Sequence, residues 1–363
     1  MGSRINSRKT HTPLYFQIAR DIREKIYAGA LAPMSRLPAE DALAKRYGVS
    51  RVTIRGALRK LHTEGLILRV NGKGTFVSPD ILTRERRIIL VLEKSPQRVA
   101  HLHELLAGAI VQAQQSGCSV LVCSNDELRA HLESAARTAS RQSGVVLLRC
   151  RNYKKADIDF AEKHGIACIM EGVKPRPGYN WITVDNAGAM RELVDHVHGL
   201  GRRRFGIFNV KVPYPWSAFE DRYSAALARL RDLGVPRKDI RTVTVSGNLT
   251  STPYRLTRRF FQAGRGDIDA LICLNDKVAA QALRWMSDNR IKVPQDVAVT
   301  GFDDVTIATY TNPPLTTARQ DYFNAGIEAV TELVGLMDDY DGRRIQRTRK
   351  LKVVIRPSTI HLA

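Results

Sequence analysis

Residues 36–77 constrain the fold more than any other part of this chain. They hold two short helical patterns separated by Gly48, and then two short apolar runs separated by Asn71-Gly72. Glycine commonly ends a helix, and an Asn-Gly pair commonly forms the tight turn of a β-hairpin. The order helix, turn, helix and hairpin predicts a helix-turn-helix with a β-wing.

One more helix is predicted ahead of this region, over residues 13–28. Its apolar residues recur every four positions and therefore form a single stripe: Leu14, Ile18, Ile22 and Ile26. Ser50 is a favourable N-cap for the second helix of the pair, which we expect to run to about residue 63. Residues 1–77 are therefore expected to form a small domain of their own.

Positive charge is concentrated in this first domain. The whole chain has a formal net charge of +21 and a pI near 10.1. Residues 1–86 contain 17 Lys+Arg and 7 Asp+Glu, whereas the much longer segment 87–363 contains 40 and 29. A basic domain favours a polyanionic partner, and together with the helix-turn-helix pattern it indicates double-stranded DNA.

Cysteine use and hydropathy argue against several other classes of protein. The five cysteines include no Cys-x-x-Cys pair and lie mostly in or beside apolar runs, which is typical of reduced thiols in a reducing cytoplasm. No apolar run approaches about 18 residues, so no membrane span is expected. The polar N-terminus lacks the apolar segment of a secretory signal.

Residues 78–87 are charged, contain a proline and are expected to be a linker. The hydropathy pattern changes after this segment. Apolar runs of strand type then alternate with helical patterns such as 101–116 and 275–289. This alternation predicts an α/β domain, with a parallel sheet covered by helices, over residues 88–363. The expected strands are 88–92, 120–123, 144–148, 167–170, 182–184, 205–208, 270–274 and 297–300.

Five short pieces of the first domain have a characteristic spacing. They are Pro13-Leu14-Tyr15, Gly29-Ala30-Leu31, Leu37-Pro38-Ala39-Glu40, Ser50-Arg51-Val52-Thr53-Ile54-Arg55 and Gly72-Lys73-Gly74-Thr75-Phe76-Val77. Together they span about 65 residues, and the domain resembles the winged helix-turn-helix of the GntR family. The resemblance implies operator contacts by Arg51, Thr53 and Arg55, where an arginine can reach a guanine edge or a phosphate.

Four other residues complete the expected DNA-binding set. Ser50 begins the recognition helix, and Gly72 and Lys73 at the wing tip suit entry into the minor groove. Arg36 is included because Asp41 stands where many GntR relatives carry an arginine, and a carboxylate repels phosphate.

Pieces of the second part also keep a known order. They are Val184-Asp185-Asn186, Gly201-Arg202-Arg203-Arg204-Phe205-Gly206-Ile207, Asp221-Arg222, Asp269-Ala270-Leu271-Ile272-Cys273-Leu274-Asn275-Asp276, Val293-Pro294-Gln295-Asp296-Val297-Ala298-Val299-Thr300-Gly301-Phe302-Asp303-Asp304, Leu315-Thr316-Thr317 and Ile355-Arg356-Pro357-Ser358-Thr359. They resemble the effector domain of the LacI/GalR regulators, relatives of the periplasmic sugar-binding proteins. GntR-type heads joined to such domains occur in arabinose-type regulators. The resemblance implies a periplasmic-binding-protein-like α/β/α sensor of two lobes, and we expect the chain to cross between them near 198–203 and again after about residue 315.

This second resemblance implies an effector site built from planar polar side chains. Such groups can each satisfy two hydroxyls of a sugar. Arg222, Asn275 and Asp303 match the family's ligand-binding positions, and Asp185 either joins them or has a structural role.

The loop just before Arg222 is unusual, because two prolines hold two aromatic residues there. Tyr214 or Trp216 is expected either to stack on a sugar ring or to pack on the protein surface. The sequence favours neither of these roles over the other.

The sequence therefore predicts a ligand-responsive transcription regulator. We expect a sugar-sensing repressor that binds a palindromic operator as a homodimer in the bacterial cytoplasm, at the nucleoid when bound to DNA. A purine- or nucleoside-responsive regulator with the same architecture is the alternative, and a DNA-tethered enzyme is a remote one. We expect no enzymatic activity, no metal and no other cofactor, since Gly-x-Ser-x-Gly, His-Glu-x-x-His and zinc-spaced Cys/His motifs are missing.

Overall fold

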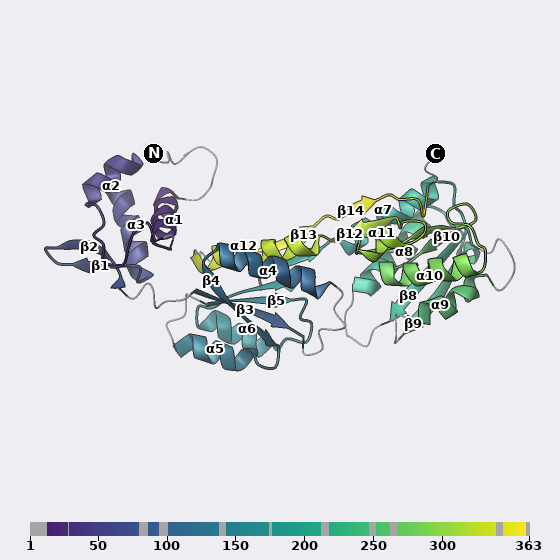
Figure 1. Ribbon diagram of the computed structural model, residues 1–363, viewed down its shortest axis with the longest axis horizontal. Helices are drawn as coiled ribbons and strands as arrows, with labels where there is room; N and C mark the ends of the chain where they lie inside the picture. The colour runs from purple at the N-terminus through teal and green to yellow at the C-terminus, as the bar shows by residue number, and fades with distance from the viewer. Residues whose placement is uncertain are drawn as a thin grey trace. The chain divides into compact units, whose positions relative to one another are not determined.

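The N-terminal part of the chain, called the head here, has the predicted order of elements (Figure 1). They are α1 (Leu14–Tyr27), α2 (Glu40–Tyr47), α3 (Arg51–Thr63), β1 (Ile67–Val70) and β2 (Gly74–Val77). The computed structural model describes residues 13–27, 29–79, 86–93, 101–137, 143–173, 176–211, 218–246, 252–261, 268–338 and 344–360. The helix-turn-helix and its wing are thus both present.

Local sequence rules set the ends of these elements. The Ser50 hydroxyl caps α3 by accepting a hydrogen bond from the backbone N–H of Thr53 at 3.2 Å. Gly48 ends α2 with a φ of 66°, and Gly72 turns the wing with a φ of 71°, a conformation that favours glycine. The strands of the wing pair antiparallel. The predicted N-cap, helix stop and hairpin are confirmed.

The head has an apolar core of its own. Ile18, Ile22 and Ile26 of α1 belong to one buried cluster with apolar residues of α2, α3 and the wing. Arg23 is only 5% exposed and donates hydrogen bonds to both carboxylate oxygens of Glu64, at 2.8 and 2.9 Å. Because an unpaired buried charge would be costly, this ion pair holds α1 against the end of α3.

Beyond the head, four parallel strands follow one another in the order β6-β5-β3-β4. Helices α4 and α12 lie over one face of these strands, and α5 and α6 lie over the other (Figure 1). All six residues of β5 are buried, as a strand covered on both faces requires. The elements are β3 (Arg86–Leu92), α4 (Leu102–Gln115), β4 (Cys118–Ser124), α5 (Leu128–Arg137), β5 (Ser143–Leu148), α6 (Lys155–Lys163), β6 (Ala167–Glu171) and α12 (Tyr322–Asp338).

Two glycines let α4 and α12 pack closely although they lie far apart in the sequence. A Cβ atom on Gly108 would stand 1.9 Å from the carbonyl oxygen of Phe323, and one on Gly326 would stand 2.1 Å from that of Leu105. Only glycine permits backbones to approach this closely. The contact brings the late helix α12 onto the strands formed early in the chain.

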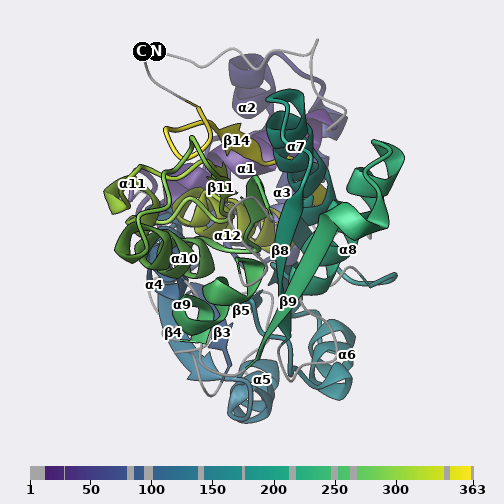
Figure 2. The same cartoon turned by 90° about the vertical axis from the view of Figure 1, so that its right-hand side faces the viewer.

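A second parallel sheet has the order β11-β10-β8-β9. Helices α9 and α10 lie on the opposite side of this sheet from α8 (Figure 2). The elements are α7 (Asn186–Gly199), β8 (Phe205–Lys211), α8 (Ala218–Asp232), β9 (Ile240–Ser246), α9 (Thr252–Thr257), β10 (Ala270–Ile272), α10 (Asp276–Asp288), β11 (Ala298–Thr300) and α11 (Ile307–Tyr310).

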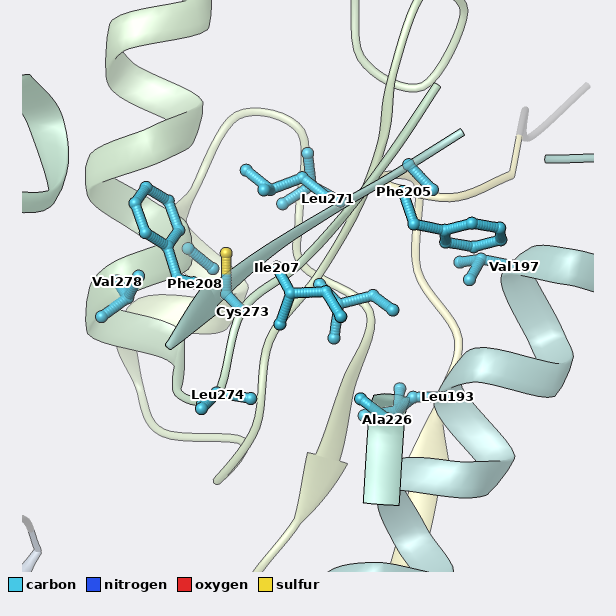
Figure 3. Packing of buried hydrophobic residues seen from close by; sticks show 14 of the residues in the cluster. Leu193, Val197, Phe205, Ile207, Phe208, Ala226, Leu271, Cys273, Leu274 and Val278 are labelled. Carbon is cyan, nitrogen blue, oxygen red and sulfur yellow. The ribbon is translucent and has the colours of Figure 1, made fainter. Parts of the chain in front are cut away.

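Apolar side chains cover both faces of this second sheet. Phe208 and Val278 lie on one side of the strands, and Leu193, Val197 and Ala226 lie on the other (Figure 3). All five are buried. The sheet is therefore the middle layer of an α/β/α sandwich, as the alternating pattern predicted.

Two further strand pairs were only partly expected from the sequence. Strand β13 (Gln346–Arg349) pairs parallel with β7 (Trp181–Val184), and β12 (Thr317–Arg319) pairs antiparallel with β14 (Lys352–Val354). Only β7 was predicted. β13 is polar and mostly exposed, so it lacks the apolar pattern that marks a strand.

The contacts between residues divide the chain into two compact units. The first contains Met1–Glu171 and Phe323–Ile345, and the second contains Gly172–Tyr322 and Gln346–Ala363. The crossing expected near 198–203 is wrong, because these residues lie inside the second unit, where α7 ends and β8 follows. Their glycines and arginines resemble a linker but form an ordinary turn between a helix and a strand.

The later crossings differ from the expectation in number. The return expected after about residue 315 falls at Tyr322, and a third crossing, which was not predicted, follows Ile345. Strand β3 begins at Arg86, so the last two residues of the expected linker 78–87 belong to a strand. Residues 80–85 of that segment lie outside the described residues.

Candidate DNA-binding and effector sites

Helix α3 separates an apolar face from a polar one. Ile54, Leu58 and Leu61 are buried in the core of the head. The side chains of Arg51 and Arg55, one turn apart, are 63% and 55% exposed. The helix therefore presents two guanidinium groups to solvent on a rigid support, which is the arrangement that contacts with DNA bases and phosphates require.

The wing carries the other residues expected at DNA. Gly72 and Lys73 are exposed at its turn, where the backbone N–H of Lys73 donates to the carbonyl of Val70 at 3.0 Å. Arg36 forms an isolated bridge with Phe76 of β2, and its side chain lies beside Gly74, where a Cβ atom would stand 2.9 Å from Arg36 Nε. Arg36 thus lies on the wing rather than on the helices.

Acidic residues in the first turn of α2 pair with arginines of α3 and β1. Asp41 forms an ion pair with Arg51. Glu40 lies 3.5 Å from Arg55 and 3.5 Å from Arg69 of β1, measured between carboxylate oxygen and guanidinium nitrogen. The sequence pointed to Asp41 only as a lost phosphate contact, and its pairing with Arg51 was missed because the two residues are on different helices.

In the second unit, Arg222 of α8 is the centre of a buried polar cluster. Its side chain is 4% exposed and its guanidinium donates from three nitrogens. Nε donates to Asn186 Oδ1 at 2.9 Å and Nη1 to the carbonyl of Leu274 at 2.7 Å, while Nη2 lies 3.1 Å from Asp303 Oδ1. The structure thus brings together Arg222 and Asp303, which the sequence analysis singled out from distant parts of the chain.

Two members of this cluster were missed by the sequence analysis. Asn186 is 5% exposed and is the first residue of α7. An asparagine at the start of a helix is common, so the sequence alone did not mark it as a site residue. The guanidinium carbon of Arg222 also lies 3.7 Å from the centre of the Phe302 ring, a cation–π contact. Asn186 directly follows Asp185, which the sequence analysis had already selected. This position beside a candidate site residue could have pointed to Asn186.

Asp303 is fixed by both its backbone and its side chain. Its φ is 112°, a region that residues with a Cβ atom rarely adopt. Its backbone N–H donates to the carbonyl of Ala318 at 2.9 Å, and Gln320 Nε2 donates to Oδ1 at 2.7 Å. Backbone strain of this kind persists only where surrounding contacts compensate for its energetic cost. It is often found at functional positions.

Asn275 and Asp185 both act as helix caps. Asn275 Oδ1 accepts from the backbone N–H of Val278 at 2.9 Å at the start of α10. Asp185 Oδ1 accepts from that of Gly188 at 2.7 Å at the start of α7. These bonds fix each side chain at the end of a strand or its following loop, where open α/β sheets commonly bind ligands. Tyr214 and Trp216, the remaining expected residues, lie outside the described residues.

Asp276 lies beside Asp303 and is fully buried. It accepts hydrogen bonds from Thr317 Oγ1 at 2.6 Å and from the backbone N–H of Val305 at 2.8 Å. Burial, and then the nearby charges of Asp303 and Asp304, raise the pKa of Asp276 to about 8 in spite of these two bonds. The carboxyl group is therefore mostly protonated at neutral pH.

Asp276→Asn is expected to make stability less dependent on pH. The unfolded chain loses this proton near pH 3.8 and the folded chain only near pH 8, so folding loses stability as the pH rises between these values. The free energy of unfolding of Asp276→Asn, relative to the original protein, should rise by about 3–4 kcal/mol from pH 5 to pH 8. Urea denaturation at both pH values measures this difference. An unchanged difference would mean that Asp276 is ionised in the folded protein.

Within the ranges given above, no group of three or more His, Cys, Asp or Glu side chains is placed to hold a metal ion. In the same ranges, no helix has the length and apolar character needed to cross a membrane.

Comparison with known proteins finds two domain families in this chain. Residues 14–77 match the bacterial regulatory proteins of the gntR family, and residues 194–359 match the periplasmic binding protein-like domain. The arabinose metabolism transcriptional repressor of Geobacillus stearothermophilus is 24% identical over 345 residues, which cover 90% of this chain and 92% of that protein. The similarity therefore extends through both parts.

Solved structures share the fold of the larger part. The LacI family transcriptional regulator CCPA from Weissella paramesenteroides with bound glucose covers 76% of this chain and 99% of its own, with 19% identity and a TM-score of 0.61. The transcriptional regulator CelR–cellobiose complex covers 89% of this chain and 100% of its own, with 19% identity and a TM-score of 0.62. At this level of identity the likeness concerns the fold alone.

A winged helix-turn-helix followed by parallel α/β units defines the class of two-part transcription regulators. The chain joins a head that matches the gntR family to a domain that matches the periplasmic binding protein-like family, whose fold it shares with LacI-family regulators. Both family resemblances inferred from the sequence are thereby confirmed, as is the predicted fold class.

Proposed function

We propose that this protein is a sugar-responsive repressor that binds a palindromic operator as a homodimer. The observation that carries the sugar-binding part is the buried cluster around Arg222. There the Asp303 carboxylate and the Asn186 amide each lie within hydrogen-bond distance of the fixed guanidinium of Arg222. Planar groups of both donor and acceptor type suit the paired hydroxyls of a sugar.

The relatives support the same proposal. One is named an arabinose metabolism repressor and another, from Klebsiella pneumoniae, a lactose operon repressor. Two of the structures with the same fold hold glucose and cellobiose. We propose that this chain shares sugar as its class of effector, with Asp185, Asn275, Tyr214 and Trp216 as further contacts beside Arg222 and Asp303.

The DNA-binding part rests on the exposed arginines of α3 and the wing. We propose that Arg51, Thr53 and Arg55 enter the major groove, with Ser50 at the start of the helix, and that Arg36, Gly72 and Lys73 contact DNA from the wing. A single head covers only a half-site, so two copies are expected on a palindrome. One chain has a mass of 40.6 kDa, and light scattering by the full-length protein should give twice this value.

A screen by thermal unfolding tests the class of effector. The full-length protein is heated with each of a panel of pentoses, hexoses, disaccharides and purine nucleosides. A ligand at one hundred times its dissociation constant stabilises the folded state by about 2.7 kcal/mol, which raises the unfolding temperature measurably. Stabilisation by a sugar, followed by a changed affinity for DNA in its presence, is the expected result. A response to purine nucleosides alone would overturn the sugar proposal and leave the regulator intact.

A further inference from the structure

Two carboxylates face the arginines that we propose to contact DNA. Asp41 pairs with Arg51, and Glu40 lies 3.5 Å from both Arg55 and Arg69. Both acidic residues belong to the first turn of α2, and the three arginines come from α3 and β1. Each of these three arginines therefore has an acidic neighbour on another element.

Stability of the head does not explain the pair formed by Asp41 and Arg51. Their side chains are 62% and 63% exposed, and ion pairs this open to water add little to folding. Favourable interaction with the N-terminal end of α2 is already supplied by Glu40. A carboxylate near the DNA backbone would also repel phosphate, so its presence here needs another reason.

The chemistry of the guanidinium group supplies one. Arginine has five N–H donors, and a bidentate contact with guanine O6 and N7 uses two of them. A carboxylate can accept from the others and so hold the guanidinium in one orientation while it contacts the base. When Arg51 instead binds a phosphate, Asp41 is brought close to a second negative charge. The pair thus favours contacts with bases over contacts with the backbone.

We propose that Asp41 is a specificity-determining residue, which positions Arg51 for a guanine edge and disfavours its binding to phosphate. The proposal rests on the proposed role of α3 in DNA binding. It explains why this chain has an aspartate next to Glu40: a uniformly basic surface would bind any DNA, whereas a surface in which acids restrain the arginines depends more on sequence.

Asp41→Asn tests this proposal because it removes the charge and keeps the shape. The probes are a duplex selected from a random library by the full-length protein and a duplex of the same bases in scrambled order. Fluorescence anisotropy gives the dissociation constant of each at several KCl concentrations. Asp41→Asn is expected to bind the scrambled duplex at least about threefold more tightly, with a salt dependence steeper by about one unit. The preference for the selected duplex should fall about tenfold.

Glu24→Gln is the matched control, since it removes one exposed carboxylate from α1, where Glu24 pairs with Arg20. It should leave the preference unchanged. A preference that falls equally in both variants would overturn the proposal, because net charge alone would then explain the effect. A preference that does not change in Asp41→Asn would overturn it as well.

The double variant Arg51→Ala/Asp41→Asn separates this proposal from the proposed function. Without Arg51, the substitution of Asp41 should no longer change the preference, because the two residues act together. An undiminished effect would mean that Asp41 acts independently of Arg51, which overturns the inference alone. If Arg51→Ala by itself leaves binding of the selected duplex unchanged, the assignment of α3 as the recognition helix fails instead.

Discussion

Arg222→Ala is expected to abolish the response to the effector. The guanidinium of Arg222 donates to Asn186 and to the carbonyl of Leu274, and it neutralises Asp303. Its removal leaves the buried carboxylate of Asp303 without its cation, which typically lowers the free energy of unfolding by about 3–5 kcal/mol. Binding of the cognate sugar, measured by calorimetric titration, should become undetectable at concentrations that saturate the original protein.

The control for this prediction is a second arginine on the same helix. Arg229 pairs with Asp195 at 2.6 Å, and both side chains are partly exposed, so Arg229→Ala should retain sugar binding. Binding of DNA without effector should survive in both variants, because the head has a core of its own. If sugar binding is undiminished in Arg222→Ala, the effector site has been placed wrongly.

If Arg222→Ala fails to fold, Asp303→Asn can still test the role of the Arg222–Asp303 pair in sugar binding. Asparagine preserves the shape of the side chain and an oxygen that can accept from Gln320 Nε2, but it removes the charge that faces Arg222. We expect sugar binding to weaken by at least about tenfold, the effect of losing roughly one charged hydrogen bond. Unchanged affinity in this folded variant would contradict the role given to the pair.

The double variant Arg51→Ala/Arg55→Ala is expected to lose specific DNA binding. Each arginine that contacts a base contributes about 1–3 kcal/mol, so the affinity for the selected duplex should fall by roughly 30-fold or more. Both side chains are exposed and neither belongs to the buried residues of α3, so the head should fold normally. Anisotropy titration measures the loss, and thermal unfolding checks the fold.

Arg20→Ala is the corresponding control in the head. Arg20 lies on α1 with its side chain 75% exposed, and its loss removes a positive charge without touching α3. A small, sequence-independent decrease in affinity is expected from the lost charge alone. Equal losses in Arg20→Ala and in the double variant would show that the head binds DNA by charge and that α3 does not recognise sequence.

The sequence by itself determined the elements of the head, since they follow from short-range rules. The Ser50 cap, the positive φ of Gly48 and the spacing of Ile18, Ile22 and Ile26 each depend on a few neighbouring residues. The parallel α/β character was likewise predictable from runs that are buried on both faces. Of the proposed site, Arg222 and Asp303 were predicted because they lie in motifs that resemble a known family.

The tertiary structure alone decided which side chains meet. Three contacts join residues from different elements: Arg222 with Asp303, Arg222 with Asn186, and Arg51 with Asp41. The return of α12 to the first unit, through its close contact at Gly108, was also not readable from the residues near it. Caps and amphipathic stripes are fixed by neighbours along the chain, whereas the partner of a buried charge depends on how the whole chain folds back on itself.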